Sequence, residues 1–186
     1  MPDRQGGDEL VAAFARWAAD QRAEAAAADR VRERSLRTQA SATATWAGIL
    51  VDLAEQATPV TAVVAAQRRR GRIVGVGPDF CVFEAHLGGP ALICLPAMSA
   101  LWPERTTTGA FPPAGARPPA LELSLLAALS MLAEERSPVT LVTSGGDEIA
   151  GDLIAAGEDV LTVQTDPPAR RLAYVRLSAL ARCELR

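Results

Sequence analysis

The chain has 186 residues, and 49% of them are hydrophobic, which is enough apolar surface for the core of one or two domains. Its 22 acidic and 19 basic residues leave a formal net charge of −3. A dedicated nucleic-acid binder usually carries an excess of basic residues. Any nucleic-acid site in this chain therefore has to be a local patch.

The sequence argues against several other classes of protein. No apolar run reaches the roughly 18 residues of a membrane-spanning helix, and the opening residues, MPDRQGGDEL, lack the apolar core of a signal peptide. Three cysteines, at positions 81, 94 and 183, are too few and too scattered for a disulfide framework. We therefore expect a reduced, cytoplasmic protein without membrane contact, and the alanine-rich, lysine-free composition is typical of a bacterial GC-rich genome.

The first 40 residues predict a helical extension. One short apolar stripe at helical spacing is formed by Leu10, Val11, Phe14, Trp17 and Ala18. The stretch 23–36 adds alanine and arginine with alternating charge, which predicts a helix of about 25 residues in all. Because a stripe this narrow cannot fold alone, we expect the helix to pack on the rest of the chain or on a protein partner.

Four short motifs occur twice, in the same order and 79 or 80 residues apart. The first occurrences are Leu53-Ala54-Glu55, Pro59-Val60-Thr61, the segment from Gly71 to Asp79, and Ser99-Ala100-Leu101. The second occurrences begin at Leu132, Pro138, Gly151 and Ser178. Four matches in one order indicate an internal repeat.

Each copy begins with an apolar helical stretch that a proline ends, at 43–56 and at 122–135. Short strands separated by turn signals follow. We expect them at 60–65, 71–76, 80–84 and 91–95, and then at 139–143, 148–156, 160–165, 171–177 and 182–185. A helix followed by about five short, bent strands predicts a small closed β-barrel, with Gly71 and Gly151 at bends where a side chain would crowd the barrel.

The predicted fold class is therefore mainly β with helices (α+β), with two tandem five-stranded small β-barrels of the SH3-like kind, each preceded by a helix. The predicted domains are a helical extension at 1–40, a first barrel at 41–103, a linker rich in Pro, Gly and Thr at 104–121, and a second barrel at 122–186.

The pattern of the second copy consists of Val139-x-Leu141, Gly145, Gly151-x-Leu153, Val160-x-x-Val163 and the run from Ala173 to Leu177. With the helix before it, this pattern resembles the Sm-like small β-barrels, a family that includes bacterial Hfq. The resemblance covers roughly two thirds of the chain, at 43–103 and 122–186. It implies an Sm-like barrel in each copy, RNA as the ligand, and dimers or rings formed by pairing the exposed edges of fourth and fifth strands. The SH3-like barrel of ribosome maturation factors has a similar rhythm, but the leading helix favours the Sm-like family.

Four arginines, Arg68, Arg69, Arg70 and Arg72, are the sharpest chemical feature of the sequence. We expect them at the turn between the first two strands of the first copy. Guanidinium groups bind phosphate in a bidentate manner, so one interpretation is a local nucleic-acid patch. The alternative is a solvated turn with surface ion pairs.

A second group combines basic and aromatic residues: Arg170, Arg171, Tyr174 and Arg176. A tyrosine ring can stack on a base while arginines hold phosphates. The alternative is a tyrosine of the barrel beside exposed arginines of a strand.

No catalytic, metal or cofactor site is expected. His86 is the only histidine, which argues against a triad and against a histidine-based metal site. Cys81 and Cys94 lack the C-x-x-C spacing of zinc ligands and suit buried strand positions. We therefore expect a non-enzymatic binding protein that contacts RNA or another nucleic acid through a local arginine patch. The alternative is a module for protein–protein interaction or oligomerisation without nucleic-acid binding.

Overall fold

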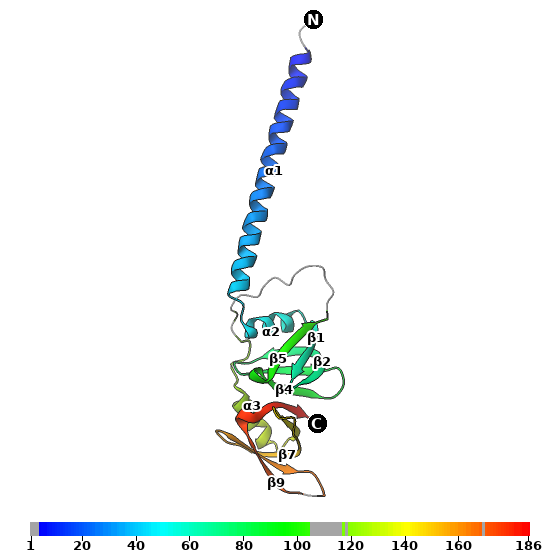
Figure 1. Cartoon of the computed structure of the whole chain (residues 1–186), viewed down its shortest axis with the longest axis vertical. Helices are drawn as coiled ribbons and strands as arrows, with labels where there is room; N and C mark the ends of the chain where they lie inside the picture. Colours follow the sequence, from blue (N-terminus) through cyan, green and yellow to red (C-terminus); the bar gives the residue numbers. More distant parts are fainter. Residues whose placement is uncertain (1–3, 105–116, 118, 169) are drawn as a thin grey trace. The chain divides into compact units, whose positions relative to one another are not determined.

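A computed structural model describes residues 4–104, 117, 119–168 and 170–186, with side chains from residue 16 onward except that of residue 37. The described chain divides into two compact units, Met1–Thr43 and Ala44–Arg186. The first unit contains the helix α1 (Arg4–Ala42). The second contains all the described strands and the helices α2 (Trp46–Glu55) and α3 (Leu125–Glu134) (Figure 1).

Helix α1 is longer than the sequence pattern predicts, with 39 residues instead of about 25. Trp17, Val31 and Leu36 on this helix are 62, 61 and 60% exposed. Within the predicted apolar stripe, the side chains of Leu10, Val11 and Phe14 lie outside the described residues. Alanine and arginine, which have high helix propensity, account for the continuation of the helix through 23–36.

Ten strands form one antiparallel sheet in the order β5-β1-β2-β3-β4-β10-β6-β7-β8-β9. In chain order these strands are β1 (Pro59–Val64), β2 (Gln67–Val76), β3 (Phe80–Ala85), β4 (Pro90–Cys94), β5 (Met98–Pro103), β6 (Pro138–Thr143), β7 (Glu148–Ala156), β8 (Val160–Thr165), β9 (Leu172–Arg176) and β10 (Leu180–Leu185). Two short 3-10 turns, η1 (Leu95–Ala97) and η2 (Leu177–Ala179), precede β5 and β10.

The prediction of two closed, five-stranded small barrels is wrong. Residues 91–93 of β4 pair with residues 182–184 of β10, and this pairing joins the strands into one open sheet. An internal repeat built from two separate barrels is therefore not supported either. The physical reason is that alternation and turn signals locate strands, whereas they do not determine which distant strand edges pair. The predicted domain boundaries at 41–103 and 122–186 stay predictions.

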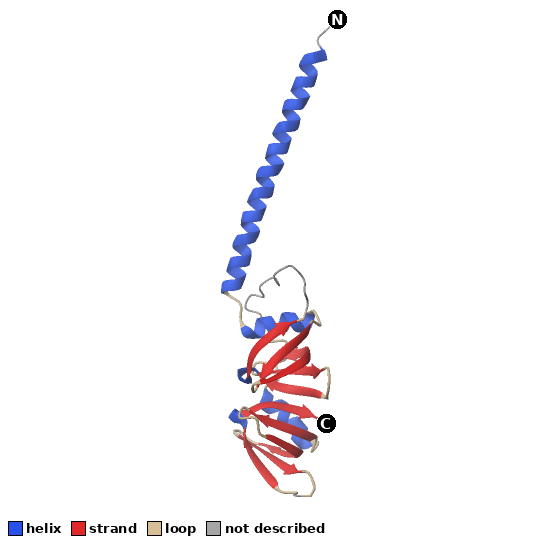
Figure 2. Ribbon diagram, turned by 45° about the vertical axis from the view of Figure 1, so that its right-hand side comes forward, coloured by secondary structure: helices blue, strands red, loops and turns tan. Residues whose placement is uncertain are grey.

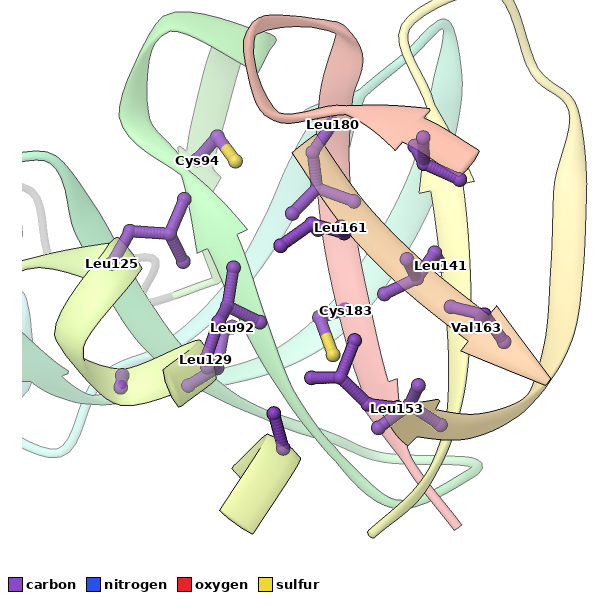
Figure 3. Close-up of a cluster of buried hydrophobic side chains, with 14 of the residues drawn as sticks. Leu92, Cys94, Leu125, Leu129, Leu141, Leu153, Leu161, Val163, Leu180 and Cys183 are labelled. Carbon is purple, nitrogen blue, oxygen red and sulfur yellow. The ribbon is translucent and has the colours of Figure 1, made fainter. Parts of the chain in front are cut away.

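The two central strands of the sheet are buried on both faces. Alternate residues of a strand point to opposite faces, and Ala91 and Ile93 of β4 join a core cluster with α2 and β1–β3. Leu92 and Cys94 instead join the cluster formed with α3 and β6–β10. Figure 3 shows Leu92 and Cys94 beside the leucines of that second cluster. Side chains on both faces therefore stabilise the pairing of β4 with β10.

The two short helices begin at polar caps and lie close to their predicted positions. The Thr45 hydroxyl accepts from the Gly48 amide at 3.1 Å, and the Ser124 hydroxyl accepts from the Ala127 amide at 3.2 Å. The Asp79 carboxylate adds a third bond, from the Leu125 amide at 2.8 Å. Such bonds satisfy amides that have no partner within the helix. Helix α2 packs against β2 and α3 packs against β7. Figure 2 shows the short helices beside the strands.

A two-residue turn joins β1 to β2, since Val64 pairs directly with Gln67. Its residues, Ala65 and Ala66, have φ angles of 48° and 62°, in the left-handed region that costs a residue with a Cβ about 1 kcal/mol. Ala66 is exposed. We expect Ala66→Gly to raise the free energy of unfolding by about 0.5 kcal/mol, because relieved strain exceeds the added flexibility of the unfolded chain. Urea denaturation followed by circular dichroism measures this change, and a loss of stability would contradict it.

Candidate functional site

The four-arginine group lies within strand β2 and not in a turn. The turn is at Ala65-Ala66, which carries none of the usual turn residues, and this explains why the sequence pattern placed the arginines there. Since side chains alternate along a strand, Arg70 and Arg72 share one face of the sheet. Arg69 faces the other way.

Arg70 is held by a carboxylate in a bidentate ion pair. Its Nε and Nη2 atoms donate to the two carboxylate oxygens of Glu104 at 2.7 and 2.8 Å. The Thr61 hydroxyl also donates to Glu104, at 3.2 Å. The hydrogen bond from Arg70 is the main reason that the pKa of Glu104 lies below its usual value. Glu104 is therefore ionised at neutral pH and occupies the side of the guanidinium that a ligand oxyanion would use.

The other three arginines of β2 also have partners. Arg72 lies 3.6 Å from the Glu84 carboxylate, an ion pair too long for a good hydrogen bond. Arg69 lies 2.7 Å from Glu184, and the guanidinium of Arg68 lies 5.4 Å from the centre of the Trp102 ring, within the range of a cation–π contact. Three of the four arginines of β2 thus lie beside a carboxylate and the fourth lies over an aromatic ring, so this strand is not a bare basic patch.

Two adjoining cavities lie along β2 and β3. The larger, of about 470 Å³, is lined by Pro59, Arg70, Gly71, Arg72, Glu84, Ala85, His86 and Glu104. The smaller, of about 320 Å³, is lined by Arg68, Arg69, Arg70, Ala85, His86 and Leu87. Their sizes are in the range of small-molecule sites. His86 follows the end of β3, and its backbone amide donates to the Arg70 carbonyl at 2.8 Å, which places it beside Arg70.

The second predicted group lies at the opposite end of the sheet order. Tyr174 and Arg176 belong to the edge strand β9, and Tyr174 is 70% exposed. Arg170 lines a third cavity, of about 250 Å³, with Asp152, Gln164, Thr165, Asp166 and Pro167. Within the described part of the chain, no ion pair involves Arg170, Arg171 or Arg176. Six strands separate β9 from β2 in the sheet, so the two groups do not form one continuous site.

The two edge strands are the feature that the sheet topology adds. In the described structure, β5 pairs only with β1 and β9 pairs only with β8. Trp102 of β5 is 47% exposed, and Leu172 of β9 is 56% exposed. Each edge therefore presents unpaired backbone groups beside exposed apolar side chains.

The three cysteines are buried and free. Burial raises the pKa of Cys81, Cys94 and Cys183 to about 12 in each case, which keeps them as unreactive thiols at neutral pH. Among the residues that the structure describes, no group of His, Cys, Asp or Glu side chains is arranged to hold a metal ion. None of the described helices is both long and apolar enough to span a membrane.

A comparison with protein-family models found no match, and a comparison with curated proteins found none either. The cavities along β2 and β3 and the two sheet edges are therefore the features of the molecule that indicate a function.

Proposed function

We propose that this protein is a non-enzymatic interaction module that assembles with further copies of itself through the two edges of its sheet. The observation that carries the proposal is the position of β5 and β9 at the ends of the ten-strand order. An edge strand has a row of unpaired N–H and C=O groups that favours pairing with another strand. Any second copy of the protein carries the same two edge strands and can therefore supply the pairing strand.

Charge opposes the pairing of two β9 edges. Arg170, Arg171 and Arg176 lie on or beside β9, so two β9 edges would bring like charges together. Strand β5 contains no charged residue, and its exposed Trp102 provides apolar surface for Tyr174 and Leu172 of another copy. A contact between β9 of one copy and β5 of the next is heterologous, so it produces either closed rings or filaments.

RNA binding is the second candidate, and one observation favours it. The arginines around β9 have no ion-pair partner in the described chain, and Tyr174 next to them is exposed. An exposed aromatic ring with free guanidinium groups is a suitable surface for single-stranded nucleic acid. This candidate predicts binding that weakens steeply with salt.

Light scattering on a sizing column tests the main proposal. We expect the full chain to have a mass above 19.5 kDa that increases with concentration. Two variants place lysines at the edges: Leu172→Lys/Tyr174→Lys at β9 and Trp102→Lys at β5. Each variant should be a monomer, because charged side chains protect a strand edge from pairing. A mixture of the two variants should give a dimer of one copy of each, since each variant keeps one intact edge.

The matched control is Val74→Lys, at a side chain that is 56% exposed in the interior strand β2. It should leave the assembly unchanged. A monomer at every concentration, or an equal effect of Val74→Lys, would overturn self-association through the edges. Excess absorbance at 260 nm that high salt and Arg176→Gln remove would favour the RNA candidate.

A further inference from the structure

The larger cavity contains more hydrogen-bond donors than acceptors. Its charged lining consists of Arg70 and Arg72 opposite Glu84 and Glu104, with His86 between the two cavities. Both oxygens of Glu104 already accept from Arg70. Arg72 has only the long contact to Glu84. Within the described residues, the His86 ring forms no hydrogen bond. Apart from the Glu84 carboxylate beside Arg72, the unused hydrogen-bonding groups of the charged lining are therefore N–H groups of Arg72 and His86.

The adjoining cavity extends this character. Its charged lining is arginine and histidine without a carboxylate, and its lining also includes Leu87, which is 84% exposed. An oxyanion satisfies guanidinium and imidazole donors, and a small organic group would fit against the apolar surface of Leu87 and Ala85. Among the described lining residues, a cation would find only the Glu84 carboxylate, which lies 3.6 Å from Arg72, because both Glu104 oxygens accept from Arg70.

We propose that these two cavities bind a small molecule that carries an oxyanion, through Arg70, Arg72 and His86, with Glu104 as an internal carboxylate that the ligand displaces from Arg70. The bidentate Arg70–Glu104 pair has the geometry with which arginine binds carboxylate or phosphate ligands. Glu104 thus competes with a ligand for Arg70 and limits binding of weak anions. This proposal is independent of the association of copies through β5 and β9.

The single histidine makes the test specific to the site. We would follow the Hε1 proton signal of His86 in untagged full-length protein by NMR, at fixed pH, during titration with inorganic pyrophosphate or with citrate. Sodium chloride of equal ionic strength is the reference. We expect a saturable shift of the signal with pyrophosphate, with citrate or with both, and the comparison identifies the ligand oxyanion as phosphate or carboxylate.

The variants separate a specific site from general attraction of anions. Arg72→Gln should weaken binding about tenfold, because a charge-assisted hydrogen bond is lost. Glu104→Gln should tighten binding about fivefold, because the internal competitor loses its charge. The matched control Arg176→Gln, at an arginine on another strand, should leave affinity unchanged. A shift no larger than that caused by sodium chloride, an equal effect of Arg176→Gln, or no gain in Glu104→Gln would overturn the proposal.

Discussion

Alanine in place of Gly151 is expected to lower the free energy of unfolding by about 3 kcal/mol. A Cβ atom at this position would lie 2.1 Å from the backbone carbonyl oxygen of Gln164 in β8. A backbone oxygen cannot rotate away as a side chain can, so β7 and β8 would have to separate and lose hydrogen bonds. Gly71 is in the same situation, with the Glu84 oxygen at 2.2 Å, and Gly71→Ala should cost a similar amount.

Urea denaturation monitored by circular dichroism measures these changes. Gly145→Ala is the matched control, because the nearest atoms to its Cβ would be 3.6 Å away, and we expect a change within about 0.5 kcal/mol. If Gly151→Ala and Gly145→Ala had equal effects, close approach of the strands would not be the reason for glycine at position 151. The measurement thus distinguishes backbone crowding from the general effect of alanine on the unfolded chain.

The local pattern of the sequence was sufficient for most elements and insufficient for their pairing. Alternation predicted the strand 160–165, and proline stops with apolar spacing predicted helices that the structure places at Trp46–Glu55 and Leu125–Glu134. Crowding at Gly71 and Gly151 was also predictable, although it occurs between neighbouring strands of an open sheet. The pairing of Ile93 with Arg182 depends on contacts between distant segments, and no local pattern encodes them.

The candidate site was predictable in composition but not in arrangement. The sequence singled out Arg70 and Arg72, and it did not show that Glu104, more than thirty residues away, would bind Arg70. This contact arises because β5 returns to pair with β1, which places residue 104 beside Pro59. A local sequence pattern can identify side chains with a given chemistry, whereas the net charge of a surface depends on partners that the topology supplies.

Arg182 connects strands from distant parts of the sheet, although it is only 2% exposed. Its Nε atom donates to Glu184 at 2.8 Å, and its Nη2 atom donates to Gln67 of β2 at 3.0 Å. Glu148 of β7 lies 3.8 Å from the same nitrogen. Among the described residues, the Nη1 atom has no hydrogen-bond partner. The guanidinium therefore has a high desolvation cost that its partners only partly offset.

We expect Arg182→Ala to lower the free energy of unfolding by about 3 kcal/mol. The change leaves a cavity, and it removes the guanidinium that donates hydrogen bonds to Gln67 and Glu184. Arg182→Met should cost about 1 kcal/mol or less, because its side chain fills most of the volume without a buried charge. Glu184 keeps its ion pair with Arg69 in both variants.

Exposed Arg176 provides the control for this pair of variants, with an expected change within about 0.5 kcal/mol for Arg176→Ala in the same urea measurement. An equal loss in Arg182→Ala and Arg182→Met would show that the charge itself stabilises the sheet. A small loss in Arg182→Met would show that packing at the junction of β10 with β2 and β7 is the larger contribution. The orphaned Nη1 atom favours the second outcome, since a buried donor without a partner opposes folding while the alkyl part of the side chain supports it.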